Sequence, residues 1–213
     1  MSTADNTTPE PQRAPATQAD RASRLGPAPR LGPAPRLGPA PRTQHWRSLG
    51  FFGTLLTRIG AFVTRKRNLG VFATIGRAPR LFRGWLHYSA TMMPFGYLSR
   101  KESESIILRV AYLRGNAYET DQHRVIARRA GLSADTIDAI QSPHPPITTA
   151  REAAMMAATT ELVETRKLTD ATYADLAAQL KDRELIAFVM LVTQYDGLAT
   201  TLDALGVPVD ESR

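Results

Sequence analysis

The residues best suited to chemistry lie in the stretch "NAYETDQH" (116–123), directly after the apolar run "SIILRVAYL". Glu119 and His123 are four residues apart, so on a helix both side chains lie on one face, close enough to interact. A carboxylate beside an imidazole raises the basicity of the imidazole and orients it for proton transfer. The spacing therefore indicates an acid–base site. An ordinary exposed ion pair on a helix surface is the alternative.

A second carboxylate, Glu104, lies on the preceding predicted helix, near the face made by Ile107, Leu108 and Ala111. If that face is buried, desolvation raises the pKa of Glu104 towards values useful in acid–base catalysis. Alternatively, Glu104 is exposed near the first turn and interacts with the helix dipole. The periodicity of the sequence leaves both interpretations open.

Two other interpretations of this region are weaker. Glu119 and His123 could hold a divalent ion with one more ligand, but no second histidine follows in register. The segment "VIARRAGLSADTIDAI" (125–140) resembles a helix-turn-helix. Its second helix, however, carries Asp135 and Asp138, which would repel phosphate groups. We therefore predict neither a metal nor a nucleic-acid ligand.

These residues must be positioned by a series of consecutive helices, because no succession of strands and turns is visible. Ser99 followed by Glu102 is a capping-box pattern, and Gly115 is a typical stop signal. The fold class is predicted to be all-α. The expected helices span 80–93, 99–115, 117–131, 133–140, 149–166, 169–180 and 182–206.

The N-terminal part of the chain differs from the rest in composition. Of the net charge of +7 over 213 residues, residues 1–100 contribute +12 and residues 101–213 contribute −5. Residues 1–42 are rich in Pro and Arg and contain three "LGPAPR" repeats, which predicts a disordered tail. A ligand for a proline-binding groove is the alternative. Residues 43–67 are predicted to form a basic amphipathic helix, and residues 68–213 the folded domain.

The segment "LSRKESESIILRVAYLRGNAYETDQHRVIARRAGLS" (98–133) resembles the core of carboxymuconolactone decarboxylase-like proteins, in the alkylhydroperoxidase D-like superfamily. That family pattern has a Glu, a second Glu fifteen residues later, and a His four residues after that. Glu104, Glu119 and His123 keep these intervals. With its flanking helices the resemblance covers about 68–209, and it implies the helical fold of that superfamily.

The resemblance also implies a choice between two chemistries. The peroxidase branch uses a Cys-x-x-Cys pair, and the matching positions here are Asn116 and Glu119. The chain has no cysteine, so dithiol peroxidase activity has no nucleophile. The decarboxylase branch works without a cofactor, by acid–base chemistry, on a lactone acid from the breakdown of aromatic compounds.

By this resemblance we expect a lyase-type enzyme that needs no cofactor and acts on a small carboxylated or lactone metabolite. The alternative is a non-catalytic binding or assembly module recruited through its basic tail. Family members form dimers, trimers or hexamers, which implies a homo-oligomer. The expected catalytic residues are Glu104, Glu119 and His123, and the expected substrate-binding residues are Tyr118, Asp121, Gln194 and Tyr195.

The start of the sequence and its most apolar window bear on secretion and membrane insertion. The sequence opens without a basic and apolar signal-peptide pattern. The most apolar window, 49–63, contains Arg58 and is shorter than the about 20 residues that span a bilayer. A membrane-surface helix at this window is the alternative. We expect no transmembrane segment and a cytoplasmic protein.

Overall fold

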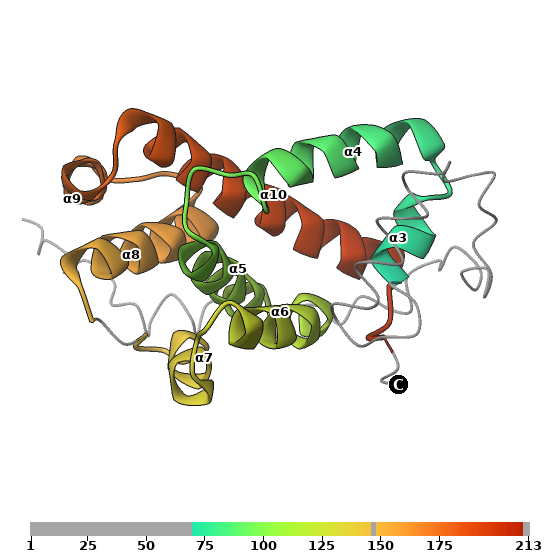
Figure 1. Cartoon of the computed structure of the whole chain (residues 1–213), viewed down its shortest axis with the longest axis horizontal. Coiled ribbons are helices and arrows are strands. Elements are labelled where there is room, and N and C mark those ends of the chain that lie inside the picture. The colour runs from blue at the N-terminus through green and yellow to red at the C-terminus, as the bar shows by residue number, and fades with distance from the viewer. Residues whose placement is uncertain (1–69, 146–147, 211–213) are drawn as a thin grey trace, which may run out of the picture. The chain divides into compact units, whose positions relative to one another are not determined.

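The computed structural model describes residues 70–145 and 148–210, and within these ranges the chain forms helices and no strand (Figure 1). The all-α prediction is confirmed. The predicted tail (1–42) and the predicted amphipathic helix (43–67) lie outside the described residues. The helices are α3 (Gly70–Ile75), α4 (Pro79–Met92), α5 (Arg100–Arg114), α6 (Ala117–Arg129), α7 (Ala134–Ile140), α8 (Ala150–Thr165), α9 (Asp170–Gln179) and α10 (Asp182–Leu205).

Helix α5 is the element on which the others converge, since it contacts α6, α7, α8 and α10 (Figure 1). Its first turn is polar, but the segment 106–111 is apolar apart from Arg109, which is the pattern of a buried segment. The side chains from Ile106 to Ala111 are all buried. A polar residue placed on such a helix is carried into the interior with it, and this applies to Glu104.

The joint between α5 and α6 is short and fixed by capping contacts. Helix α5 begins with the predicted capping box, in which Ser99 N donates to Glu102 Oε2 (2.8 Å) and Glu102 N donates to Ser99 Oγ (3.3 Å). It ends at Gly115, whose φ of +63° is left-handed and suits glycine. Asn116 then caps α6, because its Oδ1 accepts the backbone N–H of Glu119 (2.9 Å). This two-residue turn lets α6 pack directly against α5.

Helix α7 follows α6 at the segment that resembles a helix-turn-helix. Ile137 and Ile140 of α7 are buried, so this helix packs into the core. Asp138 is paired with Arg124 Nη2 at 2.6 Å. The absence of a nucleic-acid ligand stays a prediction.

Helix α10 is the longest of the described helices and packs against α5, α8 and α9. Phe188, Leu191, Val192, Ala199 and Leu202 are buried on it. Among the described helices it alone is long and apolar enough to span a bilayer by length and composition. The core helix of a globular protein passes the same test, and 33% of the apolar window of α10 is buried inside the structure.

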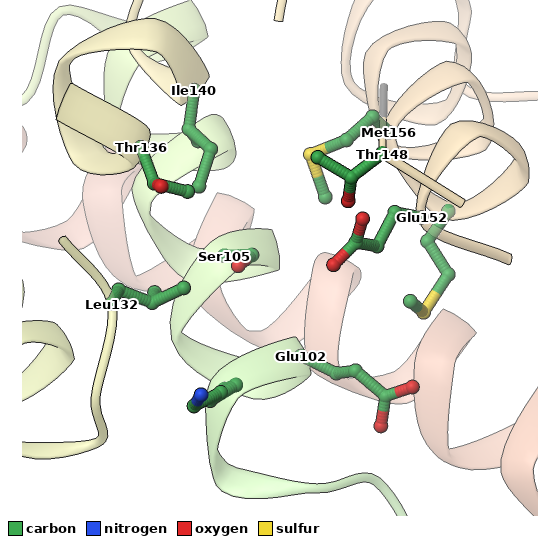
Figure 2. Close-up of a pocket in the computed structure, with 10 residues that line it drawn as sticks. Glu102, Ser105, Leu132, Thr136, Ile140, Thr148, Glu152 and Met156 are labelled. Atoms are coloured by element: carbon green, nitrogen blue, oxygen red, sulfur yellow. The ribbon is translucent and has the colours of Figure 1, made fainter. Parts of the chain in front are cut away.

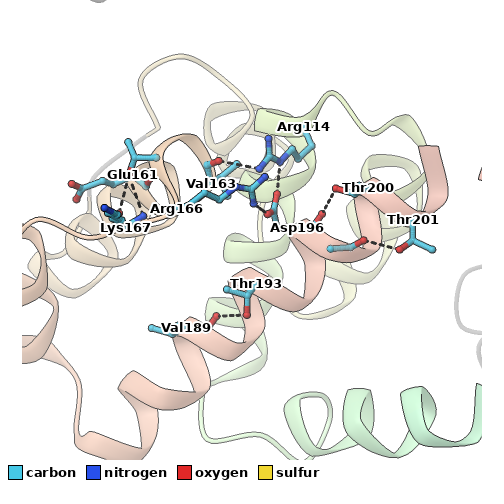
Figure 3. Close-up of polar contacts among 12 residues, drawn as sticks. Arg114, Glu161, Val163, Arg166, Lys167, Val189, Thr193, Asp196, Thr200 and Thr201 are labelled. Carbon is cyan, nitrogen blue, oxygen red and sulfur yellow. Dashed lines mark hydrogen bonds and ion pairs between the residues drawn. The ribbon is translucent and has the colours of Figure 1, made fainter. Parts of the chain in front are cut away.

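An ion-pair cluster around the buried Asp196 joins α10 to the ends of α5 and α8 (Figure 3). Asp196 is 6% exposed and accepts hydrogen bonds from the guanidinium groups of Arg114 and Arg166. Arg114 Nη2 also donates to the carbonyl of Val163 at 3.0 Å. The two arginines balance the charge of Asp196, which would otherwise be costly to bury.

We expect Asp196→Asn to lower the free energy of unfolding by about 2 kcal/mol, because it leaves the two guanidinium groups without their carboxylate. Urea denaturation at neutral pH measures this change. Asp175→Asn, at an exposed position of α9, is the matched control and should leave stability within about 0.5 kcal/mol of the wild type. An equal effect of the two substitutions would contradict the role assigned to Asp196.

Candidate functional site

The closest contact between ionisable groups of α5 and α6 joins Glu104 to His123. His123 Nδ1 lies 2.7 Å from Glu104 Oε2, and the two residues are 8% and 0% exposed. Glu104 therefore occupies the buried position that the sequence left open, and the exposed alternative is wrong. A buried carboxylate that contacts one ring nitrogen holds the imidazole in one orientation and leaves the other nitrogen for chemistry.

The structure corrects the expectation that Glu119 is the partner of His123. Glu119 is 2% exposed, and its carboxyl oxygens accept no hydrogen bond from any described residue. The spacing of four residues allows contact, but α5 presents the carboxylate of Glu104 closer to the imidazole. Glu119 instead faces the acidic side chains Asp203 and Asp196 of α10.

Burial raises the pKa of Glu119 well above its ordinary value, and the negative charges of Asp203 and Asp196 raise it further. Because ionisation would place an unpaired charge in the interior, Glu119 is a neutral carboxylic acid around its ordinary pKa and above. The site thus holds two glutamates in opposite settings. Glu104 has ionic partners, whereas Glu119 has acidic neighbours.

Tyr195 of α10 interacts electrostatically with both glutamates. Its ring meets the ring of His123 edge to face, with centroids 5.2 Å apart and planes at 87°. Burial raises the pKa of Tyr195 well above its ordinary value, as do the charges of Glu104 and Glu119, while Arg100 opposes the shift. Tyr195 therefore remains a neutral phenol that can donate a hydrogen bond. We call Arg100, Glu104, Glu119, His123 and Tyr195 the Glu104–His123 site.

Arg100 is the member of this site that the sequence analysis missed. Its Nη2 lies 3.3 Å from Glu104 Oε1, one helical turn away. The sequence contained a signal for this pair, because an Arg and a Glu four residues apart on a helix are close enough to form an ion pair. It was overlooked because such pairs usually lie on exposed surfaces.

Tyr118 takes part in a different network. Its hydroxyl donates to Asp210 Oδ2 (2.7 Å) and accepts the backbone N–H of Val71 (3.1 Å). Asp210 also accepts from Gln122 Nε2 (2.9 Å) and from the backbone of Gly70 (2.8 Å). Burial and the charge of Asp210 raise the pKa of Tyr118. These hydrogen bonds link Asp210 to α3 and α6. Tyr118 therefore has a structural role.

The remaining expected substrate-binding residues are Asp121 and Gln194, and both are half-buried. Asp121 lies close enough to Tyr118 to raise the pKa of that phenol. Gln194 directly precedes Tyr195 on α10. Of the four expected binding residues, the contacts described above bring only Tyr195 to Glu104 and His123.

A hollow of about 70 Å³ lies between α5, α7 and α8, away from the Glu104–His123 site. Figure 2 shows Ser105, Thr136 and Glu152 around it. None of the five site residues lines it. In the part of the chain that the structure describes, no three or more His, Asp or Glu side chains gather closely enough to hold a metal ion.

Residues 79–161 match the Carboxymuconolactone decarboxylase family. This part of the chain is similar to that family. The family segment contains Glu104, Glu119 and His123, whereas Tyr195 lies beyond it. No curated protein matches the sequence.

Solved structures show the same fold. An uncharacterized peroxidase-related protein from a Silicibacter species superposes with a TM-score of 0.67 at 14% identity, over 84% of this chain and 96% of that one. A variant of the debrominase Bmp8 in complex with 2,3,4-tribromopyrrole gives 0.63 at 16% identity, over 81% and 92%. The alkylhydroperoxidase AhpD core of a peroxidase-related protein from Ralstonia eutropha gives 0.58 at 19% identity, over 67% and 77%. The predicted alkylhydroperoxidase D-like fold is confirmed.

The buried acid makes a prediction about stability and pH. The raised pKa of Glu119 means that the folded state holds its proton more tightly than the unfolded chain does. This stabilisation is fully present below the ordinary pKa of 4.5 and is lost as the pH rises through the folded-state value. Glu119→Gln cannot ionise, so its stability relative to the wild type should increase as the pH rises from about 4.5 through the raised pKa of Glu119 in the folded state.

Urea denaturation of both proteins across this pH range measures the difference. Glu164→Gln, at an exposed position of α8, is the control and should show no such trend. A difference between wild type and Glu119→Gln that stays constant with pH would contradict a neutral Glu119.

Proposed function

We propose that the chain is an acid–base enzyme of the carboxy-lyase type that uses no cofactor and acts on a small carboxylated or lactone metabolite. The observation that carries the proposal is the buried 2.7 Å contact between Glu104 and His123, with Glu119 held as a neutral acid nearby. Decarboxylation needs a proton donor for the carbon that loses carbon dioxide and donors for the charge that develops. The Glu104–His123 site contains both kinds of group.

In the proposed reaction the bond between a ring carbon and its carboxylate breaks, and carbon dioxide leaves. The electron pair passes into the conjugated lactone carbonyl, where the neutral Glu119 and Tyr195 would donate hydrogen bonds to the oxygen. His123, as an imidazolium oriented by Glu104, would deliver its proton to the carbon and regain one from solvent. The net change exchanges one carboxylate for one proton.

The absence of cysteine separates this chain from thiol-dependent members of the same fold. A dithiol peroxidase attacks its substrate with a thiolate, and the 213 residues contain none. Asn116, at one of the positions matching the cysteine pair, caps α6 and donates from Nδ2 to Asp203 Oδ1 at 2.9 Å. Glu119, at the other, is the buried acid. Asn116 therefore has a structural role, whereas Glu119 would supply an acidic group.

The test is carbon dioxide release from 4-carboxymuconolactone by the full-length protein. We expect His123→Ala to lower kcat by about 10²–10⁴-fold, the usual contribution of a general acid or base. Glu104→Gln should lower kcat less, because it removes the orienting charge and leaves the imidazole in place. His87→Ala, at an exposed position of α4, is the matched control and should retain full activity.

Circular dichroism and thermal unfolding establish that the variants are folded. Release that is equally fast in folded His123→Ala would overturn the assignment of the site. No release by the wild type would remove this lactone as the substrate. If a panel of other small acids and lactones also gave no turnover, the non-catalytic binding module would replace the enzyme.

A further inference from the structure

Arg100 connects the interior of the Glu104–His123 site with solvent. It is the first residue of α5, and 40% of its side chain is exposed, whereas the side chain of Glu104 is fully buried. The contact between Arg100 Nη2 and Glu104 Oε1 at 3.3 Å spans this boundary. Glu104 is thus held from the solvent side by Arg100 and from the inner side by His123.

The ion pair between Arg100 and Glu104 does not fix the guanidinium firmly. Glu104 Oε1 is buried and accepts no aligned hydrogen bond from any described residue, so its link to Arg100 is electrostatic. A guanidinium has five N–H donors in a planar fork, and carboxylates bind such a fork through two parallel hydrogen bonds. With one nitrogen near Glu104 and the side chain open to solvent, part of the fork faces outward.

The neighbours of Arg100 suit an incoming anion. Arg100 is close enough to Tyr195 to influence the ionisation of its phenol, and the ring of Tyr195 contacts His123. A carboxylate beside Arg100 would lie on the solvent side of Glu104, whose other oxygen contacts the imidazole of His123. Burial and the neighbouring aspartates raise the pKa of Glu119 well above its ordinary value, which favours its uncharged form.

We propose that Arg100 is the residue that binds the carboxylate of the substrate, at the solvent side of the Glu104–His123 site. The ligand class is a small organic acid whose carboxylate pairs with the guanidinium while its remaining atoms extend towards His123 and Tyr195. The assignment rests on the proposed function for the identity of the substrate. The anion site itself rests on the position and contacts of Arg100.

The adjacent residue offers a matched control. Lys101 carries the same charge, lies in the same first turn of α5 and is exposed, but it lines the hollow between α5, α7 and α8. Arg100→Gln and Lys101→Gln each remove one positive charge from the same turn. Any general effect of charge is common to both variants, whereas direct contact with the ligand is specific to Arg100.

The experiment measures equilibrium binding, without turnover, by calorimetry on the full-length protein. The probes are 5-oxotetrahydrofuran-2-carboxylate, a saturated lactone acid, and its neutral amide. We expect the wild type to bind the acid about tenfold or more tightly than the amide. Arg100→Gln should lose that preference, Arg100→Lys should keep part of it, and Lys101→Gln should retain it.

Equal affinity of the wild type and Arg100→Gln for the acid would overturn the proposal, as would an equal loss in Arg100→Gln and Lys101→Gln. Failure of the wild type to prefer the acid to the amide would also overturn it. These outcomes are distinguishable from failure of the proposed function. A protein that binds the acid through Arg100 but releases no carbon dioxide keeps its anion site and loses only its assigned reaction.

Discussion

The contact between Glu104 and His123 is the constraint on which the site depends. The carboxylate of Glu104 on α5 is fully buried, and it requires partners because an unpaired charge in the interior is costly. The fold meets this requirement with an imidazole from α6 and a guanidinium from α5 itself. The close packing of α6 on α5 brings the imidazole within reach, and it follows from the short capped turn at Gly115 and Asn116.

The same fold places a second glutamate in the opposite environment. Glu119 has two aspartates of α10 as neighbours and no hydrogen-bond partner among the described residues. One of these neighbours, Asp196, also joins α10 to the ends of α5 and α8 (Figure 3). An ion pair that stabilises the helix packing therefore also helps to keep Glu119 neutral. Stability and the protonation of the site are linked through one side chain.

The two positions that the family resemblance matches to a Cys-x-x-Cys pair carry Asn116 and Glu119 in this chain. Asn116 serves as a helix cap and binds Asp203, so the first matching position has become structural. The second position carries the buried acid Glu119, while the pairing of Glu104 with His123 needs no thiol. The chemistry proposed for the site follows from which groups remain able to exchange protons.

The sequence alone determined the helical class, the capping box at Ser99 and the end of α5 at Gly115, because these depend on local periodicity and fixed spacing. Its resemblance to a family pattern predicted Glu104, Glu119 and His123 as site residues. Only the tertiary structure decided which carboxylate meets the imidazole. It also separated Tyr118 from the site and brought Tyr195 and Arg100 to it. The physical reason is that burial and pairing of charges depend on how α5, α6 and α10 pack together, and spacing along one helix does not specify that packing.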